Sequence, residues 1–112
     1  MRVMVMYDLP AVTAKEKKIH HDFQKLLVQS GFLMMQESIY CKLAQNQQAA
    51  DAIIKQLKKQ LPDKGLVQVL TITEKQFAKI EYLVGKKVSE VIDTDDRVVI
   101  LWNLSIMNME SK

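Results

Sequence analysis

The stretch that decides the fold is Arg2-Val-Met-Val-Met-Tyr-Asp-Leu-Pro10. Its two alternating sets of residues are both apolar, which is typical of a central strand with both faces covered. Asp8 ends this strand just before Leu9-Pro10. A carboxylate at a strand end offers oxygen ligands to a hard cation, Mg²⁺ or Mn²⁺, so Asp8 is the candidate catalytic and metal-binding residue. One carboxylate is a poor magnesium site, and the chemistry therefore requires a second copy of the chain. A simple Asx turn at Asp8 stays open as the alternative.

The rest of the chain alternates helical and strand-like segments. Capping-box patterns at Thr13–Glu16 and Thr73–Gln76 open two helical segments. The predicted elements are a strand at 2–7, a helix from 14 to Gly31, strands at 32–35 and 38–43, a helix capped by Asn46 and a strand at 66–72. This β-α-β-β-α-β order predicts an α+β, ferredoxin-like fold. Two further strands are predicted at Ile80–Val84 and Arg97–Leu101.

A four-stranded sheet with both helices on one face leaves its other face bare. The residues expected there are Met4 or Val3, with Tyr40 and Val69, and they are too apolar to remain in water. Extra strands or a partner must cover them, so we predict a homodimer. We expect residues 1–101 to form one domain, including the strands at 80–84 and 97–101, and residues 102–112 to form a tail.

The charge pattern favours a nucleic-acid partner. Net charge is +3, and residues 1–87 hold 14 Lys and Arg against 8 Asp and Glu. Only two of the sixteen cations are arginine, the residue whose planar fork reads guanine edges, so binding without base specificity is expected. Lys15, Lys17 and Lys18 follow Asp8 closely and are the candidate contacts to a phosphate backbone. The same lysines could instead only keep a helix face in solvent.

Several classes of site are excluded by the motifs. His20 and His21 point about 100° apart on a helix and cannot share a metal ion. No H-E-x-x-H and no cysteine cluster indicates a zinc site. Cys41 is the single cysteine, which excludes an intrachain disulfide and fits a cytoplasmic protein. No run of about 18 apolar residues is present, so no membrane span is expected.

The C-terminal region is the candidate partner contact. Apolar residues stand out in a segment that has no strand partner of its own, and interfaces are enriched in tryptophan and methionine. The alternative is a frayed tail. The residues assigned to this contact are Arg97, Trp102, Ile106, Met107 and Met109.

Three motifs together resemble one protein family. They are Val3-Met-Val-Met-Tyr-Asp-Leu-Pro10, Ser30-Gly-Phe-Leu-Met-Met-Gln-Glu-Ser-Ile-Tyr40, and Lys64-Gly65 followed by Val69-Leu-Thr-Ile-Thr-Glu-Lys-Gln-Phe77. In order and spacing they are similar to the small CRISPR-associated adaptation protein family known as Cas-two. The stretch Leu70-Thr-Ile-Thr-Glu-Lys-Gln-Phe77 resembles its type II-A branch. The resemblance covers residues 1–101.

The resemblance implies a ferredoxin-like homodimer in which late strands of one subunit pack on the sheet of the other. It implies a role in spacer acquisition, where the dimer holds prespacer double-stranded DNA between two CRISPR integrase dimers. It also implies a magnesium-dependent endonuclease on RNA or double-stranded DNA, with Asp8 of both subunits facing each other as metal ligands. DNA positioning in the integrase complex is implied to be independent of that activity. The alternative function is a stand-alone, metal-dependent ferredoxin-like endoribonuclease or toxin without an integrase partner.

Overall fold

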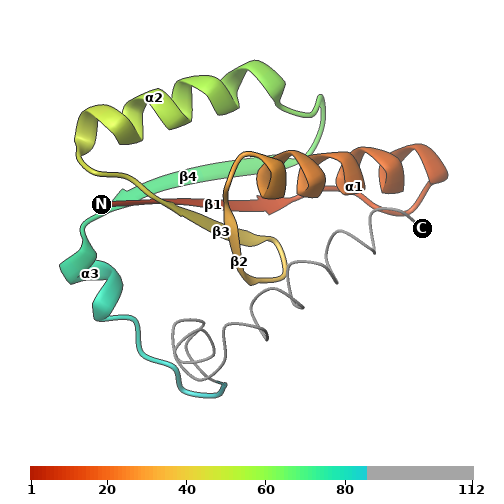
Figure 1. Ribbon diagram of the computed structural model, residues 1–112. Helices are drawn as coiled ribbons and strands as arrows, with labels where there is room; N and C mark the ends of the chain where they lie inside the picture. Colours follow the sequence, from red (N-terminus) through yellow and green to blue (C-terminus); the bar gives the residue numbers. More distant parts are fainter. Residues whose placement is uncertain (86–112) are drawn as a thin grey trace. The chain divides into compact units, whose positions relative to one another are not determined.

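The computed structural model describes residues 1–85, and the chain divides into two compact units after Lys79. All helices and strands of the described residues belong to the first unit, Met1–Lys79 (Figure 1). They are β1 (Arg2–Asp8), α1 (Ala14–Gln29), β2 (Leu33–Gln36), β3 (Ile39–Leu43), α2 (Gln47–Leu57), the 3₁₀ turn η1 (Lys58–Gln60), β4 (Leu66–Ile72) and α3 (Glu74–Ala78). The predicted β-α-β-β-α-β order is therefore confirmed.

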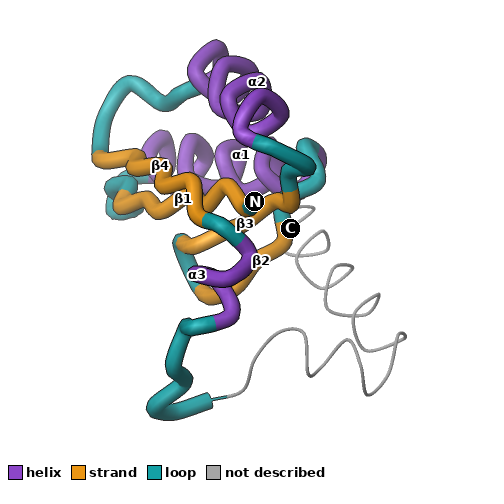
Figure 2. The backbone as a smooth tube through the Cα atoms, turned by 90° about the vertical axis from the view of Figure 1, so that its left-hand side faces the viewer, coloured by secondary structure: helices purple, strands orange, loops and turns teal. Residues whose placement is uncertain are grey.

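The strands form one antiparallel sheet in the order β2-β3-β1-β4. β1 is central, with Val5 opposite Tyr40 of β3 and opposite Val69 of β4. Both crossovers carry a helix on the same side of the sheet (Figure 2). This arrangement is the ferredoxin-like α+β fold that the sequence predicts.

Side-chain caps define where the helices begin. Thr13 accepts a hydrogen bond from the amide of Glu16, and Glu16 accepts one from the amide of Thr13, which completes the predicted capping box. Thr73 and Gln76 repeat the same reciprocal pair at α3. Asn46 caps α2 through the amide of Ala49. Helix starts are local, so the sequence alone located them.

The core lies between the sheet and the two long helices. Val3, Val5 and Tyr7 of β1 point toward α1 and α2 and are buried. The aromatic ring of Tyr7 meets Phe23 edge-on, with ring centres 5.0 Å apart, and lies beside Tyr40 at 6.1 Å. The cluster is completed by Leu9, Leu27, Phe32, Ala44, Ala50 and Leu57.

The opposite face of the sheet is not covered by α1 or α2. The alternation of β1 puts Arg2, Met4, Met6 and Asp8 there, and we call this the open face. Its neighbours in register are Ile39, Cys41 and Leu43 of β3 and Leu66, Gln68, Leu70 and Ile72 of β4. Leu43, Leu66 and Leu70 each expose half or more of their side chains. The expectation of an apolar second face is confirmed.

The predicted members of that face were partly wrong. Tyr40 is fully buried and Val69 packs against the core, so both lie on the helix side. The reason is register, because both residues stand opposite Val5, which points toward the helices. Of the pair Met4 and Val3, the open face takes Met4.

Residues 80–85, which include the predicted strand at Ile80–Val84, form neither helix nor strand in the single chain, and the strand stays a prediction for the dimer. A strand exists only where its amides and carbonyls pair with a neighbour, and the expected neighbour belonged to a second subunit. The predicted strand at 97–101 and the boundary at 101/102 lie outside the described residues. Within residues 1–85, no helix is long and apolar enough to cross a membrane.

Candidate metal and nucleic-acid site

Asp8 lies where β1 ends, on the open face. It pairs in register with Leu66, the first residue of β4, and its side chain is exposed. Leu9 follows immediately and turns the other way, into the core, where only 6% of it is exposed. The strand ladder on one side and the buried Leu9 on the other therefore fix the backbone that carries the carboxylate.

Gly65 touches this backbone from the neighbouring turn. Its φ is +94°, in the left-handed region that favours glycine. A Cβ atom built there would lie 2.7 Å from the carbonyl oxygen of Asp8 and 2.7 Å from Cδ2 of Leu9. The turn between η1 and β4 thus packs directly on the end of β1, with no room for a side chain.

The three predicted lysines do not have equal surroundings. All three side chains are exposed near the start of α1. Lys18 is paired with Asp22 at 3.1 Å, one helical turn further along. Lys15 instead lines a groove of about 240 Å³ together with Lys64, on the turn before Gly65. Sequence reasoning missed Lys64, because it stands 56 residues after Asp8 and only the fold brings it near Lys15.

Glu16 sits among these cations without being free to bind a metal. Its carboxylate accepts hydrogen bonds from the amides of Thr13 at 3.0 Å and Val12 at 3.2 Å. Those amides, first of all that of Thr13, hold the pKa of Glu16 below its usual range. The carboxylate is thus engaged in capping α1, and Asp8 remains the acid at the end of β1.

A single chain does not supply a complete metal site in the described region. No group of three or more His, Cys, Asp or Glu side chains that could hold a metal gathers among residues 1–85. His20 rests against the ring of Tyr7, with centres 5.7 Å apart, rather than beside Asp8. Magnesium keeps several waters and takes one or two protein carboxylates, so Asp8 fits such an ion once a second carboxylate approaches from another copy.

A second polar cluster lies at the opposite end of the open face, around Arg2. Its Nε donates to both carboxylate oxygens of Glu74, at 3.1 and 3.0 Å, and its guanidinium lies 4.0 Å above the ring of Phe77. Its Nη1 is 3.8 Å from Sγ of Cys41. Partial burial lowers the pKa of Arg2, but its hydrogen bonds to Glu74 and Cys41 outweigh this and raise it. We call Arg2, Glu74 and Phe77 the α3 clamp.

The clamp explains the sequence Thr73-Glu-Lys-Gln-Phe77. Thr73 and Gln76 start the helix, whereas Glu74 and Phe77 attach it to the first residue of β1. α3 consequently lies on the side of the sheet away from α1 and α2 (Figures 1 and 2). The role of Arg2 was missed, since nothing local in the sequence couples residues 2 and 74.

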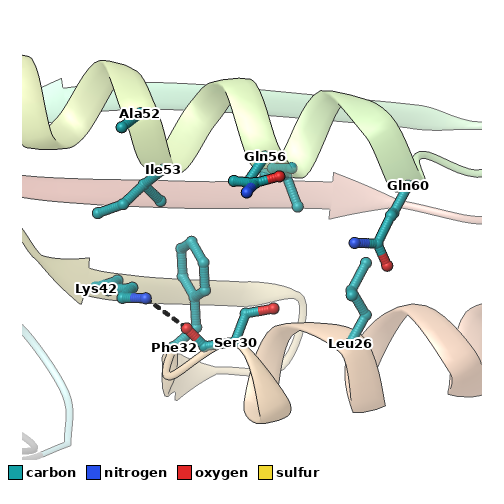
Figure 3. A pocket seen from close by; sticks show the side chains of 9 residues that line it. Leu26, Ser30, Phe32, Lys42, Ala52, Ile53, Gln56 and Gln60 are labelled. Carbon is teal, nitrogen blue, oxygen red and sulfur yellow. Dashed lines mark hydrogen bonds between the residues drawn. The ribbon is translucent and has the colours of Figure 1, made fainter.

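A pocket of about 230 Å³ lies between α1, α2 and β3 (Figure 3). Lys42 points into it from the sheet, but its Nζ donates to the carbonyl of Ser30 at 2.6 Å. That carbonyl belongs to the C-terminal end of α1, where a cation is favourable. Lys42 therefore caps a helix, and the remaining walls are apolar side chains and the amides of Gln56 and Gln60.

The predicted partner residues Arg97, Trp102, Ile106, Met107 and Met109 all lie outside the described residues. Their assignment stays a prediction. Of the predicted site residues, Asp8 and the α1 lysines lie within the described part of the chain.

Comparison with known proteins agrees with this architecture. The profile of a family described as "CRISPR associated protein Cas2" matches residues 1–80. The chain is 46% identical over 101 residues to a CRISPR-associated endoribonuclease Cas2 of Treponema denticola, covering 90% of this chain and 100% of that one. It is 44% identical over 101 residues to the protein of the same name from Streptococcus mutans, covering 90% and 93%.

A solved structure shows the same fold. The crystal structure of Streptococcus pyogenes Cas2 at pH 6.5 superimposes with a TM-score of 0.56 at 21% identity, covering 75% of this chain and 100% of that one. The family match extends over most of the described residues, and the relatives align over nearly the whole chain. The chain belongs to the CRISPR-associated Cas2 family.

Proposed function

We propose that this protein is a homodimer of CRISPR spacer acquisition, which holds prespacer double-stranded DNA between integrase dimers and carries a magnesium-dependent endonuclease site at its two Asp8 residues. The observation that carries the proposal is the position of Asp8 at the end of the apolar open face. A second subunit covering that face would bury its leucines and methionines and could bring the two carboxylates together.

The apolar face supports the dimer on energetic grounds. Burying apolar surface stabilises an assembly by about 25 cal/mol per Å². Leu43, Leu66 and Leu70 are 62%, 54% and 51% exposed, so a second subunit could still bury apolar surface on each of them. Exposed patches of this kind mark sites of protein association. Isologous pairing brings the same face of both copies together, and a residue close to the two-fold axis would then lie near its own counterpart in the other copy.

The proposed chemistry is hydrolysis of a phosphodiester. The two Asp8 carboxylates would hold the ion, and Lys15 and Lys17 would attract the phosphate backbone. When bound, magnesium supplies charge stabilisation at the phosphoryl oxygens and lowers the pKa of a bound water. The relatives named endoribonuclease support the nuclease part of the proposal.

Replacing Asp8 tests the nuclease site. Asp8→Ala and the nearly isosteric Asp8→Asn should both abolish Mg²⁺-dependent cleavage of RNA and of duplex DNA, because each removes a charged ligand. Dimer mass by light scattering and DNA affinity should be unchanged, since the side chain is exposed and outside the core. Cleavage that survives both substitutions would exclude Asp8 as the metal ligand.

The scaffold role has its own test. Mixing the protein with its cognate CRISPR integrase and a short duplex should give a stable assembly of one dimer between two integrase dimers, measured by light scattering. Binding of DNA should weaken steeply with added salt, because phosphate contacts release counterions. No assembly, together with cleavage lost in Asp8→Ala, would favour the stand-alone endoribonuclease or toxin instead.

A further inference from the structure

We infer that Gly65 is a positioning residue for Asp8, and that the absence of a side chain at Gly65 sets where the proposed metal ligand stands. The inference rests on the proposed role of Asp8. Gly65 immediately precedes Leu66, the register partner of Asp8. The Cα of Gly65 therefore lies opposite the Asp8–Leu9 peptide, where the pairing of β1 with β4 ends.

The contact is one that the surroundings cannot easily relieve. A Cβ at position 65 would lie 2.7 Å from the Asp8 carbonyl oxygen and 3.2 Å from Cα of Leu9, which are backbone atoms. Backbone atoms cannot turn away as the end of a flexible side chain can. Leu9 is also held in the core. Any side chain at position 65 must therefore change the spacing between the Asp8–Leu9 peptide and the turn at Gly65.

A displacement of the Asp8–Leu9 peptide matters for a metal site. Catalytic groups must be held within about 0.5 Å of their working positions. In a symmetric dimer the same shift would occur twice, once on each side of the axis. Any part of the shift directed toward or away from the axis would change the separation of the two carboxylates by twice its own size.

The chain contains a matched control. It has three glycines, and all have positive φ, +90° at Gly31 and +94° at both Gly65 and Gly85. Among residues 1–85, an added Cβ at Gly85 meets nothing within 4 Å, whereas at Gly31 it meets only the side chain of Lys42. Gly85→Ala thus carries the same backbone strain as Gly65→Ala without the overlap at Asp8.

The experiment compares Gly65→Ala with Gly85→Ala in the full-length protein. Mn²⁺ affinity is measured by electron paramagnetic resonance of the free ion, and kcat and KM for cleavage are measured at saturating Mg²⁺. Gly65→Ala should weaken Mn²⁺ binding and lower kcat by roughly 10- to 100-fold, with KM for the nucleic acid unchanged. Gly85→Ala should match the wild type in all three quantities.

The Gly65→Asn variant distinguishes the effect of the steric overlap with Asp8 from the effect of backbone strain at position 65. Asparagine tolerates positive φ but keeps its Cβ, so it should impair Mn²⁺ binding and kcat as alanine does. It also serves in place of Gly65→Ala if that variant does not give a folded dimer. Wild-type Mn²⁺ affinity and kcat in the folded Gly65 variant would overturn the inference.

Asp8→Ala, measured in parallel, distinguishes the two possible failures. If Asp8→Ala binds Mn²⁺ and cleaves like the wild type, the proposed function fails, and the positioning role fails with it. If Asp8→Ala loses both properties while the Gly65 variants keep them, only the role of Gly65 is refuted.

Discussion

The α3 clamp makes a quantitative prediction about Arg2. The change is Arg2→Ala, which removes the hydrogen bonds to Glu74 at 3.1 and 3.0 Å and the contact 4.0 Å above Phe77. Exposed ion pairs stabilise proteins by about 0.2–1 kcal/mol and exposed cation–π contacts by about 0.5–1 kcal/mol. The side chain of Glu74 is 50% exposed, so solvent screening puts its share near the low end of that range.

The expected total loss for Arg2→Ala is about 1 kcal/mol in the free energy of unfolding. For a domain of this size, that corresponds to a fall in Tm of about 4–8 °C. The assay is urea unfolding at one fixed protein concentration, because stability of an assembling protein depends on concentration. Arg2→Ala, Glu74→Gln and the double variant form a thermodynamic cycle, whose coupling energy isolates the Arg2–Glu74 pair.

We expect that coupling energy to be about 0.5 kcal/mol and to shrink in high salt, because screening weakens an exposed ion pair. Phe77→Leu serves as a second cycle with Arg2, since leucine keeps apolar volume but loses the aromatic ring. A coupling energy of zero in both cycles, with Arg2→Ala as stable as the wild type, would refute the claim that these contacts attach α3 to the sheet.

Two further predictions concern titratable groups. Cys41 is 2% exposed, and burial raises the pKa of its thiol. Iodoacetamide should therefore react with Cys41 much more slowly in the native protein than after unfolding in urea. Equal rates would contradict the buried placement of Cys41. The amide of Thr13 lowers the pKa of Glu16. The ionised carboxylate therefore stabilises the folded state fully above about pH 4.3, the ordinary glutamate value. This stabilisation is lost as the pH falls through the lowered pKa of Glu16. The Tm advantage of the wild type over Glu16→Gln should therefore shrink on acidification, and an advantage that is constant with pH would show that the carboxylate charge is not involved.

The sequence predicted the elements well because their signals are local. Thr13, Asn46 and Thr73 cap helices within three residues of themselves, and the structure confirms all three caps. β4 runs from Leu66 to Ile72 as predicted, bounded by the turn at Gly65. Asp8 also falls at a strand end, since the apolar run before it and Pro10 after it mark the limits of β1.

The errors come from relations between distant segments. Period-2 alternation shows that Val3 and Val5 share a face, but not which face the helices cover, because Met4 and Met6 are apolar as well. Tyr40 was consequently placed on the wrong side. The contacts of Gly65 with Asp8 and of Arg2 with Glu74 link residues more than fifty positions apart, so no local pattern indicates them.

The position of β4 has a consequence for the unassembled chain. Within the described sheet it is an outermost strand, seven residues long, with Leu66 and Leu70 half exposed. A long apolar edge of this kind is a template for pairing with unrelated strands and for aggregation. Newly made protomers would therefore have to form the native dimer before the β4 edges of different chains pair with one another. The yield of folded protein should therefore fall as the protein concentration during expression and purification rises.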